Sequence, residues 1–291
     1  MNICSCVRVW LLATVFVIGS MTAPPGWAQE GEEELGLRFT AEFSTVWTAG
    51  NSQSSTLGLA STIRYLWERS EAKLEGGAVR TESTLKSRTA VGTSEIFEIE
   101  EDKVTEKTAE AYYVRGRYDY RISEYFFLFG GTDWLRNTFA GIESRLLVAA
   151  GAGNAWLDSE RMRFKTDYSA TYTFQQDVVE NPFTKANFPG LRLAYDYWWK
   201  LTGSTEFESK LIGDLNLDNT DDVRIDFTNA LPVAISSKLA LKPSLQLLWR
   251  NDPSLTEVPL FASDGTPADQ AVLVPLQKLD SFFTISLVVT I

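Results

Sequence analysis

The chain is 291 residues long, 44% of its residues are hydrophobic, and its formal net charge at pH 7 is −11. This acidic balance argues against nucleic acid as a partner, because phosphates would be repelled at long range. The sequence has no histidine, the side chain that titrates near neutrality and serves as the base of many hydrolases. We therefore expect no catalytic residue, no cofactor and no bound metal.

The first 28 residues have the features of a secretory signal peptide. An apolar run from Val9 to Ile18 is followed by Gly26-Trp27-Ala28, which places small residues at the spacing that a signal peptidase cuts. The run is too short to cross a bilayer as a helix. We expect export, removal of 1–28 and a single domain over 29–291. Both cysteines precede the cut, so the exported domain would need no disulfide.

From residue 37 onward, apolar and polar residues alternate in segments that are typical of β-strands. A turn at Gly50-Asn51-Ser52 separates the first two segments, and Gly76-Gly77 predicts a bulge that resets the phase of the third. A polar stretch over 87–106 and a proline-rich stretch over 251–278 are expected to be loops. The predicted strands span 37–48, 57–67, about 72–87, 112–120, about 125–136, 145–156, 163–174, 191–200, 206–216, 223–233, 239–250 and 281–291.

The last segment, Ser281 to Ile291, has one apolar face and suits a final strand that pairs with the first. The strand count is even, and the long connections follow the third, seventh and eleventh strands. Together these features predict an all-β, antiparallel up-and-down transmembrane β-barrel of about 12 strands in the bacterial outer membrane. Closure is required because backbone groups left unpaired in hydrocarbon are costly. The expected partners are outer-membrane lipid and the β-barrel assembly machinery, which would recognise the last strand.

Aromatic residues gather at both ends of the apolar face, as expected for two belts at the membrane interfaces. A secreted soluble β protein, the weaker alternative, would alternate in the same way but has no reason to carry such belts. The predicted interface aromatics are Trp47, Trp67, Tyr118, Tyr120, Trp156, Tyr197, Trp199 and Trp249.

The polar face of the strands is expected to line the lumen, which would be mixed in charge and mildly basic. One interpretation is a narrow passive channel for small solutes with a weak anion preference, or an envelope-structural barrel. The other is a lumen plugged by its own ion pairs, with extracellular loops left to bind a partner or surface. The lumen candidates are Arg38, Glu42, Arg64, Arg115, Arg117, Asp119, Arg163, Lys165, Asp167, Arg192, Asp196, Glu206, Glu208, Lys210, Arg224, Asp226 and Lys242.

Two chemical alternatives compete with these interpretations. Glu206, Glu208 and Asp214 share one face of a strand and offer an acid pair for hydrolysis, but ion pairs with Lys210 and neighbouring arginines are the simpler interpretation. The acidic stretch over 95–106 offers ligands for divalent cations, but a solvated surface is again simpler.

Three short motifs resemble the DUF481 family, the YdiY-like "salt-induced outer membrane protein" group. They are Thr48-Ala49-Gly50-Asn51-Ser52, Tyr118-Asp119-Tyr120 and Gly151-Ala152-Gly153-Asn154. The chain departs from the family where Asn137 and Thr138 replace a common Asp-Arg pair, and where Asn154 replaces an aromatic residue. The resemblance implies an outer-membrane location and no particular activity.

Overall fold

The computed structural model describes residues 35–48, 53–92, 97–182, 184–261 and 267–290. The predicted signal peptide at 1–28 and the turn at 50–52 lie outside these ranges. No helix within them is long and apolar enough to cross a bilayer. The elements are β1 (Gly36–Thr48), β2 (Gln53–Leu66), β3 (Ser70–Gly92), β4 (Phe97–Arg121), β5 (Phe126–Asn137), the 3-10 helix η1 (Thr138–Ala140), β6 (Ile142–Asp158), β7 (Met162–Asp177), β8 (Asn187–Lys200), β9 (Glu206–Asn216), β10 (Val223–Ala230), β11 (Val233–Ser236), β12 (Leu239–Arg250), β13 (Leu255–Phe261), β14 (Pro267–Pro275) and β15 (Leu279–Thr290).

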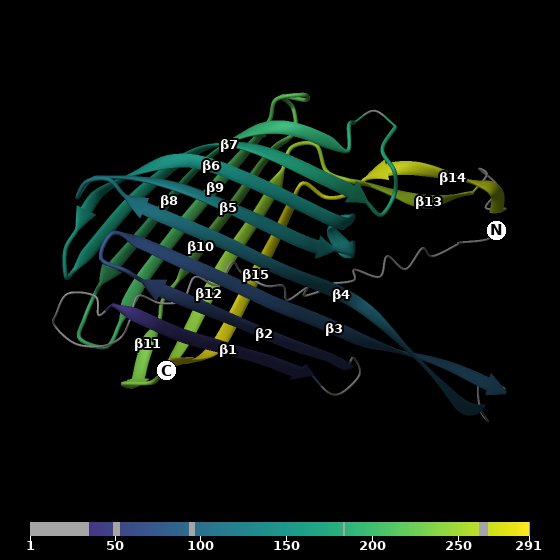
Figure 1. Cartoon of the computed structure of the whole chain (residues 1–291). Helices are drawn as coiled ribbons and strands as arrows, with labels where there is room; N and C mark the ends of the chain where they lie inside the picture. The colour runs from purple at the N-terminus through teal and green to yellow at the C-terminus, as the bar shows by residue number, and fades with distance from the viewer. Residues whose placement is uncertain (1–34, 49–52, 93–96, 183, 262–266, 291) are drawn as a thin grey trace.

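Twelve of these strands, β1 to β10 with β12 and β15, close into one antiparallel barrel (Figure 1). Each of β1 to β9 pairs with the next strand, β10 pairs with β12, β12 with β15, and β15 returns to β1. Short β11 continues the line of β10, because both pair with β12 and only Leu231 and Pro232 separate them. The predicted all-β, up-and-down barrel of about twelve strands is confirmed.

Alternation along each strand decides which side chains face the lumen. On β15, Phe282 is 4% exposed whereas its neighbour Phe283 is 55% exposed. Successive side chains of a strand point to opposite faces, so one phenylalanine enters the lumen and the other covers the outside. The same rule gives the barrel an apolar exterior and an interior filled by buried threonines, serines and charged residues.

The connections differ between the two ends of the barrel. Short turns at 67–69, 122–125, 159–161, 201–205 and 237–238 lie at one end, here called the tight-turn rim. The longer connections, including 178–186 and 251–278, lie at the other end, the long-loop rim. The start of β1 and the end of β15 both lie at the tight-turn rim, because Thr40 is opposite Thr290.

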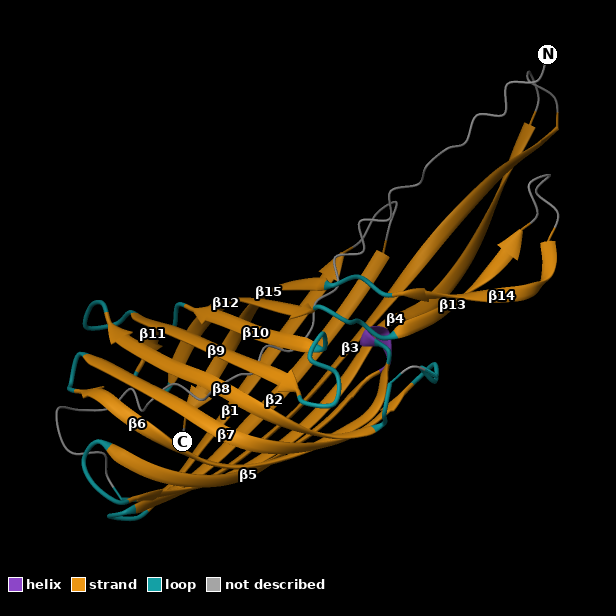
Figure 2. Cartoon of the chain, turned by 90° about the horizontal axis from the view of Figure 1, so that it is seen from above, coloured by secondary structure: helices purple, strands orange, loops and turns teal. Residues whose placement is uncertain are grey.

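The loop predicted over 87–106 is wrong. β3 continues to Gly92, β4 begins at Phe97, and the two strands stay paired to that point. The resulting hairpin projects beyond the barrel wall on the side of the long-loop rim (Figures 1 and 2). Its register places Arg88 opposite Glu101 and runs on to Gly92 opposite Phe97. A polar composition was therefore compatible with strands in water as well as with a loop.

The bulge predicted at Gly76-Gly77 is also wrong. Register with both neighbouring strands runs through these glycines, and the shift lies between Thr81 and Glu82. Charged residues lie on the inner face of β3 before the glycines and on its outer face after them. The outer surface becomes polar at Arg80, which forms an exposed ion pair with Glu82. Gly77 instead makes room for an aromatic ring, since a Cβ there would lie 2.5 Å from Cε1 of Tyr113.

The stretch predicted as the last loop contains a separate hairpin. β13 and β14 pair with each other and with no other strand of the described chain. The residues before them fold back onto the rim, where Ser254 is 2% exposed. Its hydroxyl accepts a hydrogen bond from Arg250 Nη1 at 2.9 Å and donates one to Asp177 Oδ1 at 3.3 Å. These contacts hold the connection against the long-loop rim.

An apolar contact crosses the lumen in the half of the barrel nearer the long-loop rim. Val79 of β3 and Ala111 of β4 form a buried cluster with Phe282 of β15, and Leu248 of β12 packs against it. Two other strands, β1 and β2, separate β3 from β15 in the wall, so the contact joins parts of the wall that are not neighbours. We call these four residues the constriction.

Candidate functional site

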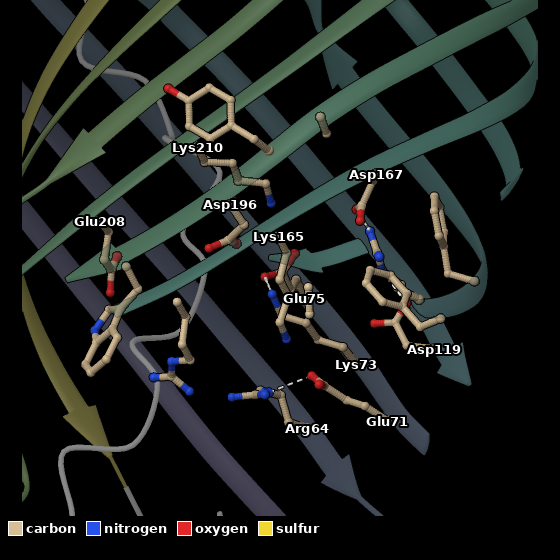
Figure 3. A pocket seen from close by; sticks show the side chains of 18 of the residues that line it. Arg64, Glu71, Lys73, Glu75, Asp119, Lys165, Asp167, Asp196, Glu208 and Lys210 are labelled. Carbon is tan, nitrogen blue, oxygen red and sulfur yellow. Dashed lines mark hydrogen bonds and ion pairs between the residues drawn. The ribbon is translucent and has the colours of Figure 1, made fainter. Parts of the chain in front are cut away.

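A cavity of about 1350 Å³ occupies the lumen on the tight-turn side of the constriction (Figure 3). Residues of the short turns line its mouth, among them Arg69, Ser159 and Gly203. Its inner end is lined by Glu75 and Ser244, and the constriction residues are not part of its lining. The cavity therefore extends from the tight-turn rim into the middle of the barrel.

The structure places most of the predicted lumen residues around this cavity. Fourteen of the seventeen candidates line it: Arg38, Arg64, Arg115, Arg117, Asp119, Arg163, Lys165, Asp167, Arg192, Asp196, Glu206, Glu208, Lys210 and Lys242. The other three also lie on the inner face. Glu42 is buried against Lys242, Arg224 pairs with Asp222, and Asp226 accepts a hydrogen bond from Gln246.

Arg192 on β8 ties together strands that are not adjacent. Its guanidinium bonds Asp214 of β9 through Nε (2.7 Å) and Asp133 of β5 through Nη1 (3.0 Å). β6 and β7 lie between β5 and β8, but their residues in the same cross-strand row are Gly151 and Ser169. On β5 this row ends at Phe129, whereas Asp133 is opposite Leu147, so the bridge runs obliquely to the row.

A second bridge joins β4 to β7. Arg117 donates to Asp119 on its own strand (2.8 Å) and to Asp167 on β7 (2.5 Å). Its guanidinium carbon lies 4.0 Å from the ring centroid of Phe129, a distance at which the cation and the ring attract each other. Arg117 is thus held by two carboxylates and one aromatic face.

A buried triad joins β1, β9 and β12. Nζ of Lys242 lies 3.4 Å from Glu42 and 3.5 Å from Glu208, and all three side chains are at most 12% exposed. Among the described residues, Oε2 of Glu42 and Oε1 of Glu208 accept no hydrogen bond. The triad thus carries two carboxylates for one ammonium.

The acid pair considered from the sequence does not come together. Glu206 accepts a hydrogen bond from Trp198 Nε1 at 2.8 Å, Glu208 faces Lys242, and Asp214 is bound by Arg192. Each carboxylate has a different partner. In the described part of the chain, no group of three or more Cys, Asp or Glu side chains is arranged to hold a metal ion.

Several lumen residues escaped the sequence analysis. Asp133 was missed because the run YFFLF gave no clear alternation for β5, and Lys73 and Glu75 because of the misplaced bulge. Leu128 and Trp134 lie on the outward face of β5. Because side chains alternate along a strand, these two apolar residues could have predicted that Asp133 faces inward. Lys73 and Glu75 form an ion pair at 2.5 Å on the cavity wall.

The predicted interface aromatics are mostly exposed around the tight-turn rim. Trp67, Tyr118, Tyr120, Trp156 and Trp199 are between 42% and 60% exposed on the outer surface. Tyr197 and Trp249 are partly buried, and the side chain of Trp47 lies outside the described part of the chain. The ring of Trp67, in the β2–β3 turn, packs against Tyr118 of β4 with centroids 6.3 Å apart.

Solved structures with a related shape are barrels of different kinds. The NanC porin is 7% identical over 87% of this chain and 99% of its own, with a TM-score of 0.44. The translocator domain of the autotransporter NalP from Neisseria meningitidis is 10% identical over 88% of each chain, with a TM-score of 0.42. An anion-selective porin from Comamonas acidovorans is 11% identical over 89% of this chain and all of its own, with a TM-score of 0.37.

Sequence comparison is more specific. The "Uncharacterized protein YdiY" of Escherichia coli strain K12 is 24% identical over 208 residues, which are 70% of this chain and 71% of that protein. Residues 41–257 match the family model described as "Protein of unknown function, DUF481". This match covers most of the barrel, so the chain belongs to the DUF481 family.

Proposed function

We propose that the protein is a bacterial outer-membrane barrel that forms a narrow passive channel for small solutes and has no catalytic activity. The observation that carries the proposal is the cavity of about 1350 Å³, lined by charged residues of both signs. A barrel that served only as a structural element would be filled by its own side chains, as small barrels are. A solvated volume of this size is what solute entry requires.

The outer surface supports a place in a membrane. On β4, Tyr120 lies in the aromatic belt, and ten residues away Glu110 lies 3.5 Å from Arg136 where the exterior becomes charged. Ten residues of strand measure about 33 Å, or about 25 Å along the axis at a tilt of about 40°. That height equals the apolar band of outer-membrane barrels.

Location and assembly are part of the same proposal. The predicted signal peptide at 1–28 would direct export and then be removed, and outer-membrane lipid would cover the apolar band. The last strand, with its single apolar face, is the proposed recognition segment for the β-barrel assembly machinery. Catalysis is left out of the proposal because the chain has no histidine and because Glu206, Glu208 and Asp214 each have a different partner.

A plugged barrel is the second candidate, and two observations favour it. The constriction joins parts of the wall that are not neighbours, and ion pairs such as Arg117 with Asp167 cross the lumen. The β3–β4 hairpin extends beyond the long-loop rim and would present a surface to a partner (Figure 2). In this case the hairpin, rather than the lumen, would perform the function.

Conductance in planar bilayers separates the two candidates. A channel should give small single-channel steps, and Phe282→Ala, which removes the largest side chain of the constriction, should enlarge them several-fold. The matched control is Phe283→Ala, because the adjacent ring faces outward and is 55% exposed. It should leave the conductance unchanged. Silence of both the wild-type protein and Phe282→Ala would reject the channel in favour of the plugged barrel.

A further inference from the structure

Of the thirteen lysines and arginines that line the cavity, six form an ion pair with a described carboxylate. Within the described part of the chain, the paired residues and their partners are Arg64 with Glu71, Lys73 with Glu75, Arg115 with Asp133, Arg117 with Asp119 and Asp167, Arg192 with Asp133 and Asp214, and Lys242 with Glu42 and Glu208. Lys165 and Lys210 differ from these residues. Neither has a described carboxylate oxygen within 4.0 Å or a side-chain hydrogen bond to a described residue.

The two lysines flank one carboxylate on three adjacent strands. Lys165 of β7 is opposite Asp196 of β8, and Asp196 is opposite Lys210 of β9. Adjacent strands are about 4.8 Å apart, so the backbones of the two lysines are separated by about 10 Å. All three side chains line the cavity (Figure 3). The row therefore carries two positive charges and one negative charge, which leaves one positive charge without compensation.

The carboxylates near the row are bound by other cations. Glu71 interacts electrostatically with Lys165, but Arg64 binds it at 2.7 Å. Lys210 interacts electrostatically with Glu75 and Asp196, but also with the cations Lys73 and Arg115. Glu75 is already bound by Lys73 at 2.5 Å. A lysine that is partly withdrawn from water among other cations is unfavourable unless an anion joins it. The site is therefore electrostatically suited to an anion that is not part of the chain.

We propose that Lys165 and Lys210 form a binding site for a small organic carboxylate that enters through the tight-turn rim. A single carboxylate matches the one uncompensated charge of the row. A phosphate monoester carries between about 1.5 and 2 negative charges at neutral pH and would exceed it. This inference rests on the proposed channel in one respect, since it names the class of solute that the channel would favour.

Calorimetric titration of the detergent-solubilised protein with gluconate, and with uncharged glucose for comparison, tests the site. Gluconate should bind and glucose should not, because the two differ in charge while their size is similar. The double variant Lys165→Gln/Lys210→Gln should weaken gluconate binding at least about tenfold. The single variant Lys210→Arg, which keeps the charge, should retain most of it. Equal binding of gluconate and glucose, or no binding of gluconate at millimolar concentration, would overturn the proposal.

The control variant is Lys238→Gln, because Lys238 is an exposed lysine of the β11–β12 turn at the same rim. It should bind gluconate as the wild-type protein does, and an equal loss in this variant would show that general surface charge is responsible. Migration on unboiled gels reports whether the double variant still folds. Binding and conductance fail independently. A protein that shows no conductance but binds gluconate would support the site and reject the channel. A protein that conducts but does not bind gluconate would support the channel and reject the site.

Discussion

At the scale of single residues, Asp222 shows how the long-loop rim is held together. The residue lies in the β9–β10 connection and is 3% exposed. Nε of Arg224 and Nε of Arg250 each donate to its Oδ1 at 3.0 Å. The positive charges of both arginines also act on the guanidinium of Arg145. One carboxylate therefore holds together a group of cations that would otherwise repel one another.

The charge state of Asp222 predicts how stability depends on pH. Burial would raise the pKa of Asp222, but the hydrogen bonds and charges of Arg224 and Arg250 outweigh burial and lower the pKa below its usual value. A lowered folded-state pKa means that the stabilisation is present above the unfolded pKa, near about 3.9, and is lost as the pH falls through the folded pKa. Asp222→Asn should therefore cost about 2 to 3 kcal/mol of unfolding free energy at neutral pH.

Urea unfolding of detergent-solubilised protein, measured as a function of pH, checks this prediction. The difference between the wild-type protein and Asp222→Asn should stay constant down to about pH 4 and shrink below it. Asp221→Asn is the control, because its side chain is exposed one position away. A difference that is unchanged in strong acid would show that Asp222 acts through shape or hydrogen bonding rather than charge.

Residue-level features were predictable from the sequence only where alternation was unambiguous. Lys165, Asp196 and Lys210 lie on strands with regular alternation, and all three line the cavity. Asp133 follows a run of aromatic residues that makes both faces of β5 apolar, so apolar and polar residues do not alternate there. Phe129 faces inward because Arg117 stacks on its ring, a tertiary contact that no local pattern reveals.

At the scale of strands, the closure between β1 and β15 is the weakest seam of the wall. Among the described residues, four pairs join them, from Thr40↔Thr290 to Phe43↔Leu287. By contrast, thirteen pairs join β1 to β2, and eleven join β12 to β15. The next position in register, Ser44 with Ser286, is already unpaired among the described strands. Unpaired backbone groups in the wall of a barrel are costly in hydrocarbon, so this seam should open first.

Hydrogen–deuterium exchange followed by mass spectrometry tests the seam. Peptides covering 44–48 and 281–286 should exchange at least about ten times faster than a peptide covering 56–62, whose amides pair on both sides. A disulfide between Ser44→Cys and Ser286→Cys should slow exchange at the seam and leave the reference peptide unchanged. If the seam and the reference exchange equally slowly in the uncrosslinked protein, the strands are paired and the seam is not weak.

The strands of the barrel wall were predictable from the sequence. With lipid on one side of the wall and water on the other, apolar and polar residues must alternate along each strand. The β3–β4 extension was not predictable, since water surrounds both faces of a hairpin that leaves the barrel and no apolar stripe is required. The same reason hides β13 and β14, which pair only with each other in the described chain and contain Pro259, Pro267 and Pro275. Prolines that suggest a loop are tolerated on edge strands.

At the scale of the whole molecule, the fold exchanges the usual positions of polar and apolar residues. Leucines, valines and aromatic residues cover the outside, while Thr40, Glu42 and Ser286 are among the most buried side chains. A protein of this kind in water would expose an apolar surface far larger than soluble monomers tolerate. Acyl chains around the band remove that cost, and the polar interior then keeps its hydration or its ion pairs. The solvent outside the barrel is therefore what the whole arrangement depends on.

Leu193→Arg tests which solvent surrounds the barrel. Leu193 lies midway along β8 and is 65% exposed, whereas Leu37 is 67% exposed at the start of β1 near the tight-turn rim. In a bilayer, an arginine at mid-depth costs about 2 to 4 kcal/mol, and one near the interface costs at most about 1 kcal/mol. Unfolding by urea in phosphatidylcholine vesicles should therefore separate Leu193→Arg from the control Leu37→Arg by at least about 1 kcal/mol. In water, two equally exposed leucines would tolerate arginine equally, so indistinguishable variants would mean that the apolar face does not meet lipid.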